Sequence, residues 1–438
     1  MKKIISCCAI AAVVAGCGLF SKDPLDISGE RISVIREDKN LRADYAAGEL
    51  RIRLPKAQLN NEWTQSGGTA THSMGHLRAR GGLDEIWNVN FGYGSSKRNI
   101  LITNPVSDGK KVYTLDVKGI LQAYDLSDGS KVWRRRLKHE NRKNRISSLI
   151  GAGLAVYDNR IIATTGFGKA FAVSADKGEI LWQKDLKAPI RIAPTVDNDL
   201  VIVQTIDNGI YVLSIRDGNL LWKDKGESEA TTMIGGASPA YDVDNDLIVA
   251  AMSNGQIQAY KASTGTPLWT EWVIAGGATE AIAEITSVKA NPVISDGVAY
   301  VVGYNGPLVA IDIRTGVKLW VKNIAASSQP WVAGKFIFIL TNEGDLAAIE
   351  KETGKVAWST IIPYAKVDKR LGTMASGPIL TNDALLVVSS NGKLFSVSPY
   401  NGRIMGIADV EDDIETTPVM VNETLLLMSK DAELTAYK

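Results

Sequence analysis

The chain has 438 residues, with 49 Lys and Arg against 48 Asp and Glu and a formal net charge of +1. This balance argues against a nucleic-acid-binding protein, which would need a strongly basic face. The length alone suggests two or three domains, and the 45% content of apolar residues suits a large core between packed sheets. Internal repeats overrule this estimate of the number of domains, because they predict a single ring of similar units.

The N-terminus has the features of an export signal. Lys2 and Lys3 precede the apolar stretch Ile4–Val14, which is too short to span a bilayer and is typical of a secretory signal peptide. The sequence Val14-Ala15-Gly16-Cys17 resembles the lipobox of bacterial lipoproteins, in which the cysteine becomes the acylated N-terminus. We therefore expect residues 1–16 to be removed and Cys17 to carry the lipid.

The segment after Cys17 is polar and contains scattered proline and glycine, so we expect a lipidated tether over residues 17–60. Several acyl chains would hold the protein on a membrane in an effectively permanent way. Gly18, not Asp, follows the cysteine. Lipoproteins without Asp at this position are usually transported to the outer membrane. We therefore expect this protein to be anchored at the periplasmic face of the outer membrane.

Few residues are available for chemistry in the mature chain. All three cysteines (Cys7, Cys8 and Cys17) lie in the N-terminal segment, so no thiol remains for a disulfide, a metal site or a nucleophile. His72 and His76 are four residues apart, but their glycine- and serine-rich surroundings indicate a loop, where a structural role is the alternative to metal binding. The sequence predicts no catalytic, cofactor-binding or metal site.

Tryptophan then recurs down the chain, each time four residues after a glycine. The intervals between these tryptophans are 49, 40, 47, 51 and 38 residues, and a period of about 40–50 residues is the mark of a repeat architecture. The pairs are Gly129/Trp133, Gly178/Trp182, Gly218/Trp222, Gly265/Trp269, Gly316/Trp320 and Gly354/Trp358.

Each repeat reads as a four-stranded antiparallel meander. A second glycine, often in Asn-Gly, precedes the first by about ten residues and signals a hairpin. Apolar runs flank it, such as Val298–Gly303 before Asn305-Gly306 and Leu308–Ile311 after it. A proline further upstream suits the start of the innermost strand. We expect the tryptophan to lie on the outer strand and pack against the next repeat, which makes a β-propeller.

The number of blades follows from both ends of the chain. A seventh repeat has Gly406 where tryptophan is expected, which suggests a weaker blade, and the last strand, Glu433–Tyr437, has no outer neighbour. The segment from Gly82 to Trp87 resembles an outer strand without its inner three. We therefore expect an eight-bladed, all-β propeller over residues 61–438 whose last blade is closed by the N-terminal strand. The alternative is a seven-bladed ring with a spare hairpin.

Two charged runs interrupt the repeats. Arg134 to Arg145 is strongly basic, and Glu411 to Glu415 is acidic. The basic run suits a solvated edge strand whose charges discourage edge-to-edge pairing, and the alternative is a contact for an acidic partner or lipid phosphates. We interpret the acidic run as a solvated loop.

The pattern of (Thr/Asp)-Gly-x-x-x-Trp within each blade resembles the repeat of pyrroloquinoline-quinone (PQQ) dehydrogenases and of the BamB family of outer-membrane lipoproteins. The lipobox, the bare ring and the absence of cysteine favour the BamB family over a PQQ-dependent periplasmic dehydrogenase. The resemblance implies a non-enzymatic scaffold without a cofactor. It would belong to the Bam complex, dock to the POTRA domains of BamA and assist unfolded outer-membrane proteins.

The same resemblance implies candidate docking residues. Lys225 and Glu227 lie in a stretch similar to the segment of the family that contacts BamA, although Asp224 replaces an apolar residue there. Ser287 and Lys289 stand where family members can have acids. The remaining predicted site residues are structural, namely the blade tryptophans Trp87, Trp133, Trp182, Trp222, Trp269, Trp320 and Trp358.

Overall fold

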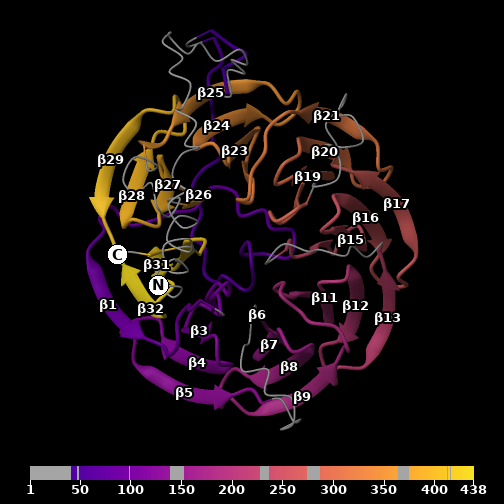
Figure 1. Ribbon diagram of the computed structural model, residues 1–438. Helices are drawn as coiled ribbons and strands as arrows, with labels where there is room; N and C mark the ends of the chain where they lie inside the picture. The colour runs from indigo at the N-terminus through magenta and orange to yellow at the C-terminus, as the bar shows by residue number, and fades with distance from the viewer. Residues whose placement is uncertain are drawn as a thin grey trace, which may run out of the picture. The chain divides into compact units, whose positions relative to one another are not determined.

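Residues 85–438 form a ring of eight blades around a central axis (Figure 1). The computed structural model describes residues 41–46, 49–97, 99–138, 152–226, 236–273, 287–363, 374–411, 413–414 and 416–438. Each blade is a four-stranded antiparallel sheet, as the repeats predict. Among the described residues, no helix is long and apolar enough to cross a membrane. The predicted signal peptide and Cys17 lie outside the described residues.

Blades 1 to 7 each use four consecutive strands, from the innermost to the outermost. Blades 1 to 4 contain β2 (Val106–Ser107), β3 (Lys111–Leu115), β4 (Ile120–Asp125), β5 (Lys131–Arg136); β6 (Ala152–Tyr157), β7 (Arg160–Thr165), β8 (Lys169–Ser174), β9 (Ile180–Asp185); β10 (Thr195–Asp197), β11 (Leu200–Gln204), β12 (Gly209–Ser214), β13 (Leu220–Lys225); and β14 (Ala240–Asp242), β15 (Leu247–Ala251), β16 (Gln256–Lys261), β17 (Pro267–Trp272).

Blades 5 to 7 repeat the arrangement. They contain β18 (Val293–Ser295), β19 (Val298–Val302), β20 (Leu308–Asp312), β21 (Lys318–Lys322); β22 (Trp331–Ala333), β23 (Phe336–Leu340), β24 (Asp345–Glu350), β25 (Val356–Ile361); and β26 (Ala375–Thr381), β27 (Ala384–Ser389), β28 (Lys393–Val397), β29 (Ile404–Asp409). The bounds of β19 and β20 agree with the predicted strands to within one residue.

Blade 8 joins the two ends of the chain. Its inner strands are β30 (Val419–Val421), β31 (Thr424–Met428) and β32 (Glu433–Tyr437), and its outer strand is β1 (Glu85–Asn90). The pairing of β1 with β32 is antiparallel, with Trp87 opposite Ala436. The prediction of eight blades closed by an N-terminal strand is confirmed, and the seven-bladed alternative is wrong.

Seven tryptophans, which we call the tryptophan belt, connect neighbouring blades near the rim, at every contact except that between blades 7 and 8. The structure places Trp87, Trp133, Trp182, Trp222, Trp269, Trp320 and Trp358 on outer strands. Each indole lies against the turn glycine of the following blade, so that a Cβ built on Gly265 would approach Trp222 Cδ2 to 2.6 Å. Each indole Nε1 also donates a hydrogen bond of 2.7 to 2.9 Å to a carbonyl near that turn.

The missing eighth tryptophan has a structural cause. Gly406 lies on β29 of blade 7, so its partner would be the turn between the third and outer strands of blade 8. That turn does not exist, because β32 ends near the C-terminus and β1 comes from the other end of the chain. Blade 7 has four paired strands like the others, and the absence of tryptophan reflects the lack of a turn to receive it.

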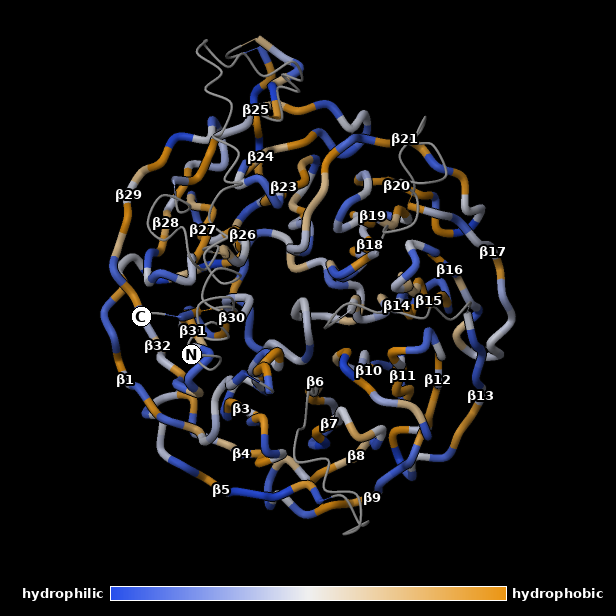
Figure 2. Tube along the Cα trace, viewed as in Figure 1, coloured by the Kyte–Doolittle hydropathy of each residue, from blue (hydrophilic) through white to orange (hydrophobic). Residues whose placement is uncertain are grey.

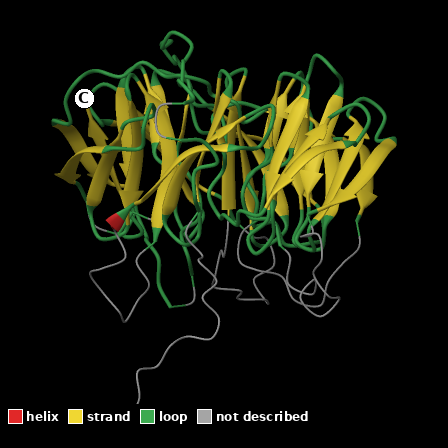
Figure 3. Cartoon of the chain, turned by 90° about the horizontal axis from the view of Figure 1, so that it is seen from above, coloured by secondary structure: helices red, strands yellow, loops and turns green. Residues whose placement is uncertain are grey.

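The ring has two faces, between which the strands run (Figure 3). We call one the linker face, because the antiparallel order places there both the connections between blades and the turns between second and third strands. The other, the turn face, carries the turns between the first two and the last two strands. The apolar core lies between neighbouring blades, where most residues of the middle strands are buried (Figure 2).

Residues 58–78 form a closed loop inside the ring, which we call the collar. Their backbone passes the innermost strands of all eight blades in ring order. In blade 8 Asn422 N donates to Asn60 O, and in blade 1 Trp63 and Ser107 exchange two backbone hydrogen bonds. The contacts in blades 2 to 6 are, in order, Val156 N to Thr64 O, Val196 N to Gln65 Oε1, Tyr241 N to Ala70 O, Ile294 N to Thr71 O and Trp331 Nε1 to Gly75 O. In blade 7 Leu77 N donates to Leu380 O.

The collar closes on itself and is well packed. Arg78 N donates to Gln58 O at 2.7 Å, and Gln58 N donates to His76 O at 2.9 Å. Trp63 is 1% exposed and stacks on Trp331 with ring centres 6.4 Å apart. The collar thus contributes a second hydrophobic connection, at the centre of the ring.

The part of the predicted tether that the structure describes also lies on the blades. Ile52 is buried in the core cluster, and Asp44 accepts a hydrogen bond from Lys322 Nζ at 2.6 Å. The division between tether and propeller at residue 60 stays a prediction. The lipid attachment upstream stays a prediction.

Candidate functional site at the centre of the ring

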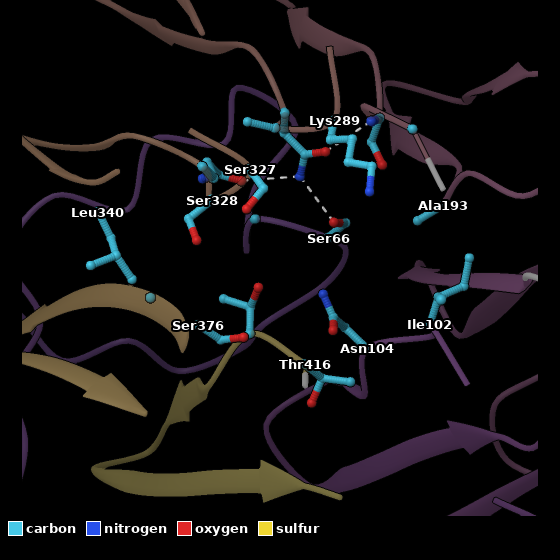
Figure 4. Close-up of a pocket in the computed structure, with 18 of the residues that line it drawn as sticks. Ser66, Ile102, Asn104, Ala193, Lys289, Ser327, Ser328, Leu340, Ser376 and Thr416 are labelled. Carbon is cyan, nitrogen blue, oxygen red and sulfur yellow. Dashed lines mark hydrogen bonds between the residues drawn. The ribbon is translucent and has the colours of Figure 1, made fainter. Parts of the chain in front are cut away.

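A central cavity of about 580 Å³ lies inside the ring (Figure 4). Its wall reaches from collar residues Trp63, Ser66 and Gly67 to Tyr304 and Asn342, which lie in second-to-third-strand turns on the linker face. The volume falls in the usual range of small-molecule sites. Because the collar lies between the cavity and the turn face, the linker face is the side from which a ligand would enter.

The wall is built by equivalent positions of successive blades. In six blades the three residues before the innermost-strand proline contribute to the lining, although Thr103 and Ala237 do not reach it. The third residue before the proline is Ile102, Arg191, Gly236, Lys289, Ser327 or Ala375. The equivalent positions in blades 2 and 8, Ile150 and Glu415, lie outside the described residues.

Hydrogen bonds between blade 5, blade 6 and the collar hold one side of the cavity. Asn291 Nδ2 donates to Ser66 Oγ at 2.9 Å and to Gln329 Oε1 at 3.0 Å. Gln329 Nε2 in turn donates to the carbonyl of His72 at 2.9 Å. The amide oxygen of Asn291 accepts from Ser238 N of blade 4. This network fixes the polar side chains that face the cavity.

Two cations line the cavity, and its described lining contains no Asp, Glu or His. Arg191 Nε is buried without a hydrogen-bond partner among the described residues. The ammonium group of Lys289 lies 5.0 Å from the centre of the Tyr304 ring, and burial lowers the pKa of this lysine. The described lining therefore offers no carboxylate to ligate a metal ion, and its electrostatic character is positive.

The two collar histidines bind backbone carbonyls. His72 Nδ1 lies 2.7 Å from Pro292 O, and burial lowers the pKa of His72 to about 4. His76 Nδ1 lies 2.7 Å from Pro55 O, and its Nε2 contacts Asn382 O. No cluster of three or more His, Cys, Asp or Glu suitable for a metal ion occurs in the described ranges.

The structure brings the two candidate docking segments to the same face. Lys225 ends β13 and forms a 2.9 Å ion pair with Asp207, whose hydrogen bond and charge raise the pKa of the lysine. Tyr304 N donates to the carbonyl of buried Ser287. Gly226, next to Lys225, donates its N–H to the carbonyl of Asn208. Asn208 and Val288, which lies between Ser287 and Lys289, line the same small cavity. The two docking segments are therefore neighbours on the linker face. Glu227 lies outside the described residues.

The two charged runs are only partly described. Arg134, Arg135 and Arg136 lie on the exposed edge strand β5, where Arg135 Nε donates to Gly178 O of the next blade. Asp413 pairs with Lys430. Residues 139–151, Asp412 and Glu415 lie outside the described residues, so the interpretations of both runs stay predictions.

Sequence reasoning missed Arg191 and the collar. Lys289 was singled out only by resemblance, as a docking residue, whereas the structure places it in the cavity wall. A usable signal was present, because Arg191 and Lys289 both stand three residues before an innermost-strand proline, Pro194 and Pro292. The collar carries no comparable signal in its sequence.

The chain is similar to a family of outer-membrane assembly proteins. A family model described as "Outer membrane protein assembly factor BamB" matches residues 117–360. The protein of that name from Moranella endobia is 23% identical over 335 residues, which are 76% of this chain and 84% of the relative.

Solved structures show the same fold. BamB from Moraxella catarrhalis superimposes with a TM-score of 0.67 at 20% identity, over 81% of this chain and 99% of that one. A quinohemoprotein alcohol dehydrogenase from Comamonas testosteroni reaches 0.66 at 13% identity, over 87% of this chain and 81% of that one. At these identities both likenesses concern the fold alone.

Proposed function

Because the chain belongs to the family of the outer membrane protein assembly factor BamB, we propose that it is a non-enzymatic scaffold in the assembly of outer-membrane proteins. The family match, which covers more than half of the chain, is the observation that carries this proposal. The bare ring is compatible with a scaffold, because the described strands form the eight blades and no second domain.

The lipid at Cys17 would hold the propeller at the periplasmic face of the outer membrane. Replacement of Cys17 by alanine should move the protein from the outer-membrane fraction to the soluble periplasmic fraction, as measured by immunoblotting of separated membranes. Retention of the Cys17→Ala protein in the outer membrane would contradict the lipid anchor.

We place the docking surface for BamA on the linker face, around Lys225. The Lys225 side chain is more than half exposed although it pairs with Asp207, so it can contact an acidic partner without prior unfolding. Contacts of rim charges mainly steer association and set its dependence on salt. The neighbouring Ser287 is buried and acts through the backbone of Tyr304, so we expect a structural role for it.

Affinity purification of the tagged lipoprotein from solubilised outer membranes tests the proposal. BamA and other members of the Bam complex should co-purify, and Lys225→Glu should reduce their yield more than the control Lys131→Glu. Lys131 is exposed at the start of β5, toward the turn face. Reproducible purification without BamA would overturn the proposed complex, and equal yields for the two variants would move the docking surface elsewhere.

The dehydrogenase alternative has the shared fold in its favour. PQQ and Ca²⁺ added to the purified protein, with alcohols or sugars and an artificial electron acceptor, should give no turnover. Turnover that depends on PQQ would overturn the non-enzymatic part of the proposal.

A further inference from the structure

The positive charge of the central cavity has no counterpart in its described wall. Arg191 and Lys289 occupy equivalent positions in blades 3 and 5, three residues before the innermost-strand prolines. Gly236 occupies the position between them in blade 4, and a Cβ there would approach Ile192 Cδ1 to 2.7 Å. Among the positions three residues before these prolines, the one between Arg191 and Lys289 is therefore without a side chain.

Both cations are partly removed from water, and no described residue supplies a compensating anion. Arg191 Nε is buried and unpaired among the described residues. Lys289 is half-buried, forms no ion pair or hydrogen bond with the described residues and faces the Tyr304 ring. Burial of a charge without a partner is unfavourable, and a ligand that supplies the missing negative charge recovers this free energy.

We propose that the central cavity binds a small organic anion, with its carboxylate or phosphate group held between Arg191 and Lys289. The guanidinium group suits either anion, because its fork of N–H donors matches two oxygens at once. The lysine adds a compact charge on the other side. This inference is independent of the proposed role in membrane-protein assembly.

The rest of the wall suits the body of such a ligand. Trp63, Leu154, Leu340 and Pro378 provide apolar surface. Hydroxyl groups of Ser66, Ser327, Ser328 and Ser376 surround the hollow into which the Lys289 side chain extends (Figure 4). A cavity with apolar walls and few convergent polar groups is the usual form of a small-molecule site. Its volume of about 580 Å³ accommodates a ligand of one or two rings.

Isothermal titration calorimetry of the purified lipoprotein in detergent tests the site. The probes are phthalate and phenyl phosphate, which present the two anionic groups on an aromatic body, inorganic phosphate as the bare anion, and dimethyl phthalate as a neutral match. We expect saturable binding of at least one aromatic anion and none of dimethyl phthalate. Phthalate and phenyl phosphate distinguish a carboxylate from a phosphate ligand, and inorganic phosphate shows whether the anionic group suffices.

Matched variants assign the binding to the two cations. Arg191→Met and Lys289→Met should each weaken binding by about tenfold or more, as expected for a charge-assisted hydrogen bond. Lys223→Met, which removes the same charge from an exposed position on β13, should leave it unchanged. Lys289→Arg keeps the charge and should retain binding within a few-fold, so a loss seen only in Lys289→Met is not a folding defect.

Three results would overturn the proposal. They are no saturable binding of phthalate, phenyl phosphate or phosphate to the wild-type protein, equal binding of dimethyl phthalate, or anion binding that survives both Arg191→Met and Lys289→Met unchanged. The last result would place the anion elsewhere on the surface.

Discussion

The ring is held together in two different ways at its rim and at its centre. At the rim, the tryptophan belt joins neighbours in pairs, with one indole against one turn glycine at each of seven contacts. At the centre, one continuous segment, the collar, contacts all eight blades. Belt contacts are local and repeated, so each one can fail separately. Collar contacts share one backbone, so their loss is collective.

Removal of the collar should have the largest effect on stability. Replacement of residues 59–77 by a glycine-serine linker of equal length deletes Trp63, Leu77 and the Gln65 side chain that bonds Val196, and it removes the packing that holds the other collar hydrogen bonds in place. We expect the free energy of unfolding to fall by more than about 5 kcal/mol, because loss of a single buried tryptophan costs about 3–5 kcal/mol. Urea denaturation measures the change. A loss under about 1 kcal/mol would show that the belt alone holds the ring.

Loss of one belt tryptophan should cost less. Trp182 is 9% exposed and its Nε1 donates to Ile215 O at 2.8 Å, so Trp182→Ala should lower the free energy of unfolding by about 3–5 kcal/mol. Leu181→Ala, at the exposed neighbouring position, should stay within about 0.5 kcal/mol. Similar losses for the two variants in thermal or urea unfolding would argue against an inter-blade role for the indole.

The collar should also make stability depend on pH. Burial lowers the pKa of His72 from 6.5 to about 4, so the unfolded chain binds the proton more readily than the folded one. The stability from neutral His72 is complete above about pH 6.5 and is lost as pH falls toward 4, with a limit of about 3 kcal/mol.

The variant His72→Asn isolates this contribution, because asparagine tolerates the positive φ of 59° at this position. Unfolding curves at pH 7, 5.5 and 4.5 should show a smaller decrease for His72→Asn than for the wild type. Other groups titrate in both proteins and cancel in the difference. Parallel pH profiles would mean that His72 ionises without disturbing the collar.

The smallest effect should distinguish a belt contact from the gap in the belt. Gly265 has a φ of +75°, and an added Cβ would meet the Trp222 ring, so Gly265→Ala should cost about 1–3 kcal/mol. Gly406 has no atom within 4 Å of an added Cβ, and Gly406→Ala should change stability by no more than about 0.5 kcal/mol. Equal melting temperatures for the two variants would contradict the role of the turn glycine.

The same contrast explains what the sequence could predict. Belt positions repeat seven times, so Trp133 or Gly178 is recognisable by its period. The same period showed that tryptophan is missing at position 406, but it could not show why. The collar occurs once, is rich in glycine and serine, and binds mainly through its backbone. Its composition indicated a loop, because hydrogen bonds between a main chain and strand ends leave no pattern of side chains.

The cavity was partly predictable. Pro194 and Pro292 mark the starts of innermost strands, and the residues before them had to face the axis. Lys289 was noticed for another reason, and Arg191 was not. That neither has an acidic partner among the described residues depends on which side chains meet across the ring, and only the three-dimensional arrangement of the blades shows this.

The pairing of β1 with β32 has a consequence for the order of folding. Trp87 and Ala436 are opposite each other although roughly 350 residues of chain separate them, and contacts between distant parts of a chain slow folding. During synthesis β1 emerges before the blades, whereas its partner β32 emerges after them. Blades 1 to 7 can form as the chain emerges, and the ring closes only when the final strand arrives.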